Sequence, residues 1–237
     1  MKKHIPNLIT CMNLISGSFA IVMALRGQLK LAAFMIIVAA VFDFFDGFTA
    51  RLLNVQSPIG GDLDSLADVF SFGGAPSMII LVWLEKCLQN LPPAQINGFV
   101  QLLPYLALVI PAFSAVRLAK FNNDERQHTE FRGLASPANA LFLGFLPLSA
   151  EKLPFVNNFW IVLAFVCIFC FLLVCDLPMF SLKFRNFKWK GNEIRFSFLT
   201  IALFLLIFFR LGAFPIIILT YILISISLFA IRKIQVL

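Results

Sequence analysis

Apolar residues fill most of this chain in long runs, and short polar stretches separate the runs. A helix needs about 20 predominantly apolar residues to cross the hydrocarbon core of a bilayer. Runs of about this length predict an all-α, polytopic membrane helix bundle with about eight transmembrane helices, within a range of six to eight. The predicted spans are 8–25, 31–50, 63–84, 99–119, 136–150, 155–177, 196–211 and 213–231.

Two parts of this prediction leave an alternative. The run 136–150 is short and contains Pro137 and Pro147, and proline disrupts the interior of a helix. The last two runs are separated only by Leu211 and Gly212, so they form either two spans or one tight hairpin.

Composition identifies lipid as the main solvent of the chain. Hydrophobic residues make up 60% of it and charged residues only 13%, whereas soluble domains carry about a quarter charged residues. A soluble core of this size cannot bury so much apolar surface. Disordered, disulfide-rich and collagen-like proteins use quite different residues and are excluded.

The basic residues predict the orientation, because Lys and Arg accumulate in cytoplasmic loops. The net charge is +7. If the N-terminus is cytoplasmic, most Lys and Arg residues fall inside, so both termini are predicted to be cytoplasmic. The basic stretch 181–195 is expected to anchor the chain at anionic head groups. The basic residues left outside are Arg26, Lys30, Lys86, Lys152 and Arg210.

Acidic residues gather in one short part of the chain. Asp43 and Asp46 are three residues apart, and Asp64 and Asp68 are four apart, so each pair lies on one face of its helix. The two helices run in opposite directions, which brings both pairs to the same end of the bundle. Four converging carboxylates repel each other unless cations hold them, and oxygen ligands suit Mg²⁺ or Mn²⁺.

The residues beside the first pair suggest what the cation would hold. Gly47 and Ala50 leave the helix face bare, and Arg51 is a planar donor suited to phosphate. Together these features favour a pyrophosphate-bearing ligand. The alternative is that the acids are helix caps and ion-pair partners. For Asp62, which precedes the predicted helix, a capping role explains the residue as well as a functional role does.

The whole pattern resembles a known signature. The residues Asp43, Asp46, Gly47, Ala50, Arg51, Gly60, Asp64 and Asp68 match every position of the D-x2-D-G-x2-A-R-x8-G-x3-D-x3-D motif of the CDP-alcohol phosphatidyltransferase family. Segments 6–13, 63–77, 117–124 and 131–140 also resemble the integral-membrane phosphatidylserine synthases of that family. Gly74 and Ala135 depart from that subgroup, which usually has valine and proline there.

The resemblance implies an activity and its setting. It implies transfer of the phosphatidyl group from CDP-diacylglycerol to L-serine with release of CMP, using two Mg²⁺ or Mn²⁺ ions per active site. It further implies a homodimer in a prokaryotic cytoplasmic membrane, with the active site facing the cytoplasm. The whole chain 1–237 is expected to be one catalytic domain, with a family core at about 5–177 and additional spans over 196–231.

The resemblance also implies roles for the motif residues. It makes Asp43, Asp46 and Asp64 metal ligands, and it makes Asp68 both a ligand near the second metal and the general base. The positions that correspond to CDP-diacylglycerol binding are Gly47, Ala50, Arg51 and Gly60, with Ser57 and Ser65 as further candidates.

Two other groups of polar residues are candidates for substrate binding. Asn7, Thr10 and Asn13 recur every three residues on one helix face, where they either line the CDP-diacylglycerol pocket or form a polar helix start. Ser136 either lines the pocket or caps the fifth span. Arg117 and Lys120 either bind the acceptor or extend to lipid head groups. The candidates for serine binding are Arg117, Lys120, Asn122, Asn123 and Ser136.

Two rival functions stay open. The acceptor could be glycerol 3-phosphate or an inositol phosphate, which would need a denser set of cations near the aspartates; Arg117, Lys120, Arg126 and Arg132 are the ones available. The chain could instead be a divalent-cation transporter, although a transporter predicts acids spread through the membrane depth and has no use for Arg51.

Overall fold

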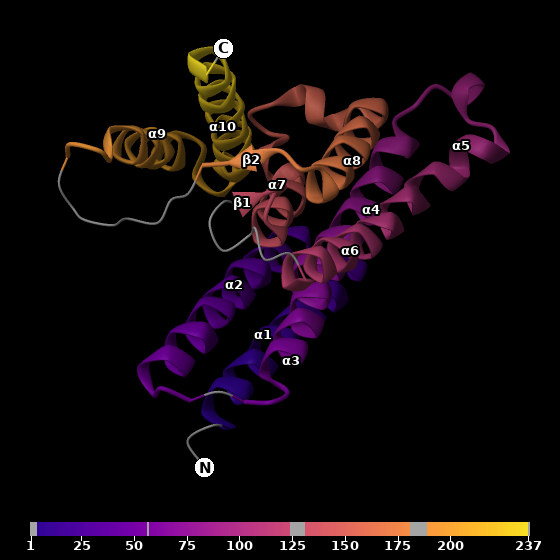
Figure 1. Ribbon diagram of the computed structural model, residues 1–237. Helices are drawn as coiled ribbons and strands as arrows, with labels where there is room; N and C mark the ends of the chain where they lie inside the picture. The colour runs from indigo at the N-terminus through magenta and orange to yellow at the C-terminus, as the bar shows by residue number, and fades with distance from the viewer. Residues whose placement is uncertain (1–3, 56, 124–130, 181–188, 237) are drawn as a thin grey trace.

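Helices form nearly all of the computed structural model, which describes residues 4–55, 57–123, 131–180 and 189–236 (Figure 1). Two strands of two residues each, which the sequence did not predict, pair antiparallel. The principal elements are α1 (His4–Leu25), α2 (Leu29–Leu52), α3 (Gly60–Asp68), η1 (Val69–Gly74), α4 (Ala75–Gln89), α5 (Gly98–Leu102), η3 (Leu103–Leu108), α6 (Val109–Asn123), β1 (Phe131–Arg132), α7 (Ser136–Ser149), α8 (Phe159–Val174), β2 (Pro178–Met179), α9 (Glu193–Phe209), η6 (Arg210–Ala213) and α10 (Phe214–Val236), with short 3₁₀ turns at Pro93–Gln95 and Pro154–Asn157.

Five helical stretches among the described residues are long and apolar enough to cross a membrane, and Phe159–Val174 is a shorter apolar helix. They support a polytopic helix bundle and an integral membrane protein. The count of eight spans and the cytoplasmic position of both termini stay predictions. The five stretches are His4–Leu25, Leu29–Leu52, Gly60–Gln89, Gly98–Asn123 and Glu193–Ala230.

Small side chains hold the N-terminal helices together. The core between α1, α2 and α4 contains fully buried Ala20, Ala32, Ala39 and Ala75, and small residues let helix backbones approach closely in membranes. The closest approach is at Gly17, where a Cβ atom would lie 2.6 Å from Ser71 Cα. Helix α1 therefore packs backbone to backbone against the third helical stretch.

That third stretch contains a π-helical segment, η1, directly after Asp68. The wider π turn rotates the faces of α3 relative to those of α4, and such segments occur often at functional sites. The apolar run 63–84 predicts one uninterrupted helix, because a pattern of apolar residues does not reveal a local change in hydrogen bonding.

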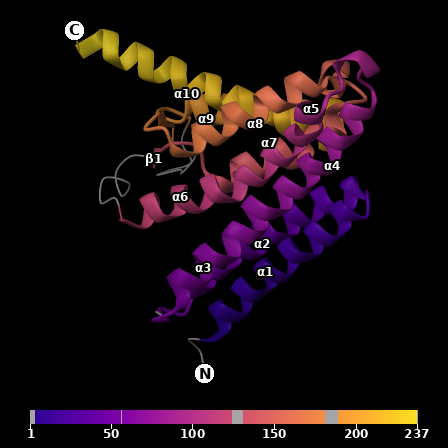
Figure 2. The same ribbon diagram turned by 90° about the vertical axis from the view of Figure 1, so that its right-hand side faces the viewer.

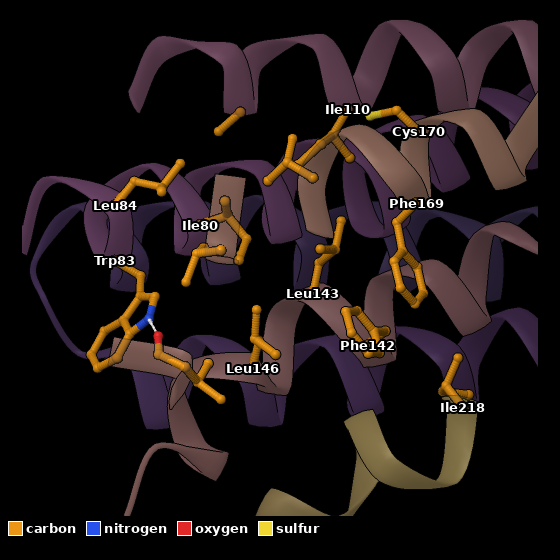
Figure 3. Close-up of a cluster of buried hydrophobic side chains, with 14 of the residues drawn as sticks. Ile80, Trp83, Leu84, Ile110, Phe142, Leu143, Leu146, Phe169, Cys170 and Ile218 are labelled. Carbon is orange, nitrogen blue, oxygen red and sulfur yellow. Dashed lines mark hydrogen bonds between the residues drawn. The ribbon is translucent and has the colours of Figure 1, made fainter. Parts of the chain in front are cut away.

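Larger side chains form a second core between α4, α6, α7, α8 and α10 (Figure 3). The rings of Phe142 and Phe169 stack with centroids 3.6 Å apart. The Trp83 Nε1 atom donates to the Val156 carbonyl at 3.2 Å, which satisfies the polar edge of a buried indole. This core fixes α7 and α8 against α4.

Helix α9 packs loosely by comparison, whereas α10 contributes to the second core. Helix α9 extends away from the bundle in Figure 1, and Phe198 is the single buried residue along its fully described length. Helix α10 holds β2 in place, because Tyr221 Oη donates to the Phe180 carbonyl at 2.9 Å. The basic stretch predicted as an anchor falls largely on residues 181–188, outside the described residues.

Candidate active site

Three carboxylates converge where α2 meets α3. Asp43 on α2 and Asp64 and Asp68 on α3 each place one oxygen so that the three oxygens lie within 4.8 Å of one another. The loop that joins α2 to α3 lies beside the N-terminal end of α1 in both views (Figures 1 and 2). Like charges at this distance repel strongly in a partly buried site, so the arrangement calls for a cation.

The oxygen atoms at this point suit a hard divalent ion. Asp64 Oδ1 and Asn13 Oδ1 are buried and have no hydrogen-bond partner among the described residues. Asp68 is only 7% exposed, and its Oδ1 accepts a hydrogen bond from Asn13 Nδ2 at 3.2 Å. Carboxylate and amide oxygens are the ligands that Mg²⁺ and Mn²⁺ prefer. The residues present therefore fit such an ion.

Asp46 lies one turn further along α2, outside the cluster of three. It is 7% exposed, and its Oδ2 accepts a hydrogen bond from Thr10 Oγ1 at 2.7 Å. This bond ties α2 to α1 and restricts the rotamer of the Asp46 side chain. Its role as a fourth ligand stays a prediction.

The polar face of α1 contacts three different parts of the motif. Asn7 Nδ2 donates to Ser57 Oγ at 3.0 Å in the α2–α3 loop. Thr10 bonds Asp46, and Asn13 bonds Asp68, as described above. Helix α1 is thus the element that orients two of the aspartates and the loop, whichever ligand the site binds.

Beyond Asp46, the loop end of α2 presents small residues and one guanidinium. Arg51 folds back along the helix, so that its Nη1 lies 3.5 Å from where a Cβ on Gly47 would be. Ala50 is half-buried beside it. Gly60 lies next to Ser57 and Asn7, with a Cβ position 3.2 Å from Ser57 Cβ. A phosphate could approach the backbone here and meet Arg51, which is consistent with the predicted pyrophosphate site.

The structure separates the predicted serine-binding residues. Lys120 Nζ donates to the Val174 carbonyl at 3.0 Å, at the C-terminal end of α8. Asn122 Nδ2 donates to Ser65 Oγ at 2.9 Å and so joins α6 to α3. Asn123 Nδ2 donates to the Ala119 carbonyl of its own helix. These three side chains are exposed and already have structural partners.

Arg117 is different, because it is buried near the aspartates. It is 8% exposed, its guanidinium lies 5.0 Å from the centroid of the Phe121 ring, and it is close enough to Asp68 to attract it. Among the five predicted serine-binding residues, Arg117 is therefore the cation that the fold brings to the carboxylates.

Sequence reasoning missed two buried polar residues, Ser114 and Asn139. Both are fully buried, as is Ser136, and their side-chain polar atoms have no hydrogen-bond partner among the described residues. Ser136 is not the cap of α7, since the N-cap residue is Ala135 and it makes no side-chain cap bond. In the sequence, Asn139 lies within segment 131–140, which resembles the phosphatidylserine synthases, whereas nothing marked Ser114.

Comparison with known proteins identifies relatives over most of the chain. The sequence model of the CDP-alcohol phosphatidyltransferase family matches residues 3–172. Three proteins named CDP-diacylglycerol–serine O-phosphatidyltransferase are similar. The one from Mycobacterium bovis is 33% identical over 186 residues (74% of this chain, 60% of the relative). The one from Helicobacter pylori is 28% identical over 209 residues (86% of this chain, 81% of the relative). The one from Bacillus subtilis is 32% identical over 190 residues (80% of this chain, 94% of the relative). The chain thus spans 60% of the length of the mycobacterial relative.

Proposed function

The chain belongs to the CDP-alcohol phosphatidyltransferase family, and on that premise we propose that it transfers the phosphatidyl group of CDP-diacylglycerol to L-serine and releases CMP. The observation that carries this proposal is the convergence of Asp43, Asp64 and Asp68 near the loop end of α2, where the Arg51 guanidinium lies over Gly47. The names of the relatives support serine as the acceptor. The product would make the protein an enzyme of phospholipid biosynthesis.

The donor is bound at the loop end of α2. Arg51 pairs with the pyrophosphate, and Gly47, Ala50 and Gly60 leave room for the nucleotide beside the backbone. Ser57, Ser65 and Asn7 are further candidates for binding the donor, and Asn7 Nδ2 donates to Ser57 Oγ within that loop. A divalent ion, held by Asp43, Asp64 and Asp68 with Asp46, would withdraw electrons from the pyrophosphate and stabilise the charge of departing CMP.

Asp68 acts as the general base. Asn13 donates to one oxygen of its carboxylate and fixes the orientation of the side chain, so that the other oxygen accepts the proton of the serine hydroxyl. The serine oxygen then forms a bond to the phosphatidyl phosphorus, and the bond from that phosphorus to the CMP oxygen breaks. The burial of Asp68 keeps water from competing with serine for this position.

Arg117 binds the carboxylate of serine. It is a buried cation that interacts electrostatically with Asp68, and a guanidinium suits a carboxylate in two-point contact. Lys120, Asn122 and Asn123 contribute indirectly, because their hydrogen bonds hold α6 against α3 and α8. We further propose a homodimer in a prokaryotic cytoplasmic membrane, with each active site facing the cytoplasm.

One experiment tests the function and its chief rival together. Purified protein in detergent is given CDP-diacylglycerol with Mg²⁺, Mn²⁺ or chelator, and CMP release is compared among L-serine, glycerol 3-phosphate, inositol 1-phosphate and no acceptor. We expect release that depends on both serine and metal, and that falls 10²- to 10⁴-fold, the usual contribution of a general base, in Asp68→Asn. The exposed Asp176 provides a matched control, Asp176→Asn, which should keep full activity. If CMP is released only with a phosphorylated acceptor, that acceptor replaces serine in the proposed reaction. If folded protein releases no CMP with any acceptor, the proposed enzymatic activity is wrong.

A further inference from the structure

Three buried side chains on α6 and α7 carry polar atoms that lack partners among the described residues. They are Ser114 Oγ, Ser136 Oγ and both side-chain atoms of Asn139, and all three residues are 0% exposed. Leaving such groups unpaired is costly to folding, and the great majority of buried polar groups are paired. A group of several on neighbouring helices points to a polar ligand.

The packing of α7 against α2 brings Ser136 and Asn139 near the depth of the aspartates in the bundle. A Cβ on Gly144 would lie 2.6 Å from Ile36 Cδ1, and Leu141 shares an apolar groove with Ala40 and Phe44, so α2 and α7 run in opposite directions. At about 1.5 Å per residue, Asp43 and Ser136 lie at nearly the same depth. Asn139 lies one turn deeper in the bundle.

The packing of α6 brings Ser114 to the same region. Ser114 contacts Gly73 of η1, where a Cβ would lie 3.2 Å from Ser114 Cβ, while Asn122 bonds Ser65 further along. Arg117 is between these two contacts and therefore level with the start of η1. Ser114 and Arg117 are three residues apart and share one helix face.

We propose that Ser114, Ser136 and Asn139 complete, with Arg117, a pocket for the amino-acid part of the acceptor, deeper in the bundle than Asp68. This inference rests on the proposed function and adds two residues, Ser114 and Asn139, that the motif does not contain. The hydroxyl oxygens of Ser114 and Ser136 and Asn139 Oδ1 accept hydrogen bonds from the ammonium group of the substrate. Asn139 Nδ2 donates to the carboxylate of the substrate, together with Arg117. One buried cation and neutral oxygens match a zwitterion, whereas a phosphate dianion would keep an excess negative charge next to the aspartates.

The test uses the full-length protein and the near-isosteric change Asn139→Leu. We expect the KM for serine to rise at least about tenfold, because the charged ends of serine lose hydrogen-bond partners, while the KM for CDP-diacylglycerol stays unchanged. The thermal midpoint without serine should stay equal or rise, because an unpaired buried amide has been removed. Added serine should raise the midpoint of the wild type and not that of the variant.

Two smaller changes on the same faces guard against misfolding of that variant. Ser136→Ala and Ser114→Ala should each raise the KM for serine a few-fold. The matched control is Ser149→Ala at the other end of α7, since Ser149 is also fully buried but donates to the Leu146 carbonyl of its own helix. This control should leave the KM for serine unchanged.

The outcomes separate the two proposals. If the wild type uses serine and all three pocket variants keep its KM, the pocket is wrong while the proposed function stands. A lower thermal midpoint with an unchanged KM in Asn139→Leu would mean that Asn139 supports the fold only. If the wild type does not use serine, the proposed function fails, and this inference fails with it.

Discussion

The first three helical stretches and the last two helices are both strongly apolar, yet they pack differently. In the N-terminal region, residues 4–89, buried alanines bring the helices together, and side-chain hydrogen bonds cross from α1 to the motif. In the C-terminal pair, α9 and α10, the large side chains of α9 face outward, with Phe204 and Ile207 61% and 67% exposed, while α10 buries Ile218 and Ile222 in the core of larger side chains.

The difference shows that hydrophobicity indicates which segments lie in the membrane, whereas small side chains indicate where helices pack closely enough to form a site. Where residues are small, backbones come close enough for short polar side chains such as Thr10 and Asn13 to reach a neighbouring helix. Where they are large and face outward, the helix needs only lipid as a partner. The carboxylates therefore lie in the tightly packed region, which can hold like charges together.

The largest expected effect is at the carboxylate cluster. Asp43→Asn should lower CMP release by about a thousandfold, because metal charge stabilisation contributes several kcal/mol. The same variant should have a higher thermal midpoint than the wild type in chelator, since one of three repelling charges is gone. Activity and thermal scans with and without Mn²⁺ measure both. A variant that keeps its activity, or loses stability in chelator, would contradict the cluster as a metal site.

Close packing in the N-terminal region can be broken at one glycine. Gly17→Ala places a Cβ 2.6 Å from Ser71 Cα, a contact with backbone that must shift, and we expect a loss of about 2–3 kcal/mol in unfolding free energy. Denaturation in mixed micelles measures it. Gly98→Ala is the control, because a Cβ there meets nothing within 4 Å. Equal stability of the two variants would show that the α1–η1 contact is less tight than described.

A hydrogen bond between helices should matter more than one within a helix. Thr10→Val removes the bond to Asp46 and should weaken the apparent Mn²⁺ affinity about 10- to 100-fold, the usual effect of losing a partner of a metal ligand. Thr220→Val on α10 is the matched control, since its Oγ1 bonds only the Ile216 carbonyl of its own helix. Metal titrations of CMP release compare them. An unchanged affinity in Thr10→Val would remove Asp46 from the ligand set.

The C-terminal pair should give the smallest effects. Tyr221→Phe removes the bond to the Phe180 carbonyl and should lower stability by about 1 kcal/mol, with the KM for serine changed less than about twofold. Phe204→Ala, on the exposed face of α9, should change neither quantity measurably. Thermal scans and serine titrations test both. A large loss of activity in either variant would mean that the C-terminal pair contributes directly to the site.

The sequence was sufficient to predict the part of the site whose residues are close together in the chain. Asp43, Asp64 and Asp68 lie on two consecutive helices joined by a short loop, so helical spacing alone was enough to bring them together. The eight apolar runs indicated helices for the same reason. The π turn of η1 was not predictable, since the apolar pattern does not record a local change in hydrogen bonding; the contact of Gly17 with Ser71 in this segment joins residues that are far apart in sequence.

The acceptor side is non-local, and sequence reasoning was weaker there. Lys120, Asn122 and Asn123 were grouped with Arg117 because they are neighbours in the chain, but they point to α8, α3 and their own helix. Asn139 was missed because its position relative to Asp43 depends on the register of α7 against α2. That register is set by tertiary contacts such as Gly144 with Ile36.

The confinement of all four aspartates to one helical hairpin has a consequence for biogenesis. A nascent chain that has inserted its first three helical stretches already contains every proposed metal ligand, together with the α1 residues that orient two of them. Contacts between neighbouring segments form sooner than distant ones. We therefore expect the donor half of the site to take shape during translation, while Arg117 and Asn139 arrive only when α6 and α7 have entered the membrane.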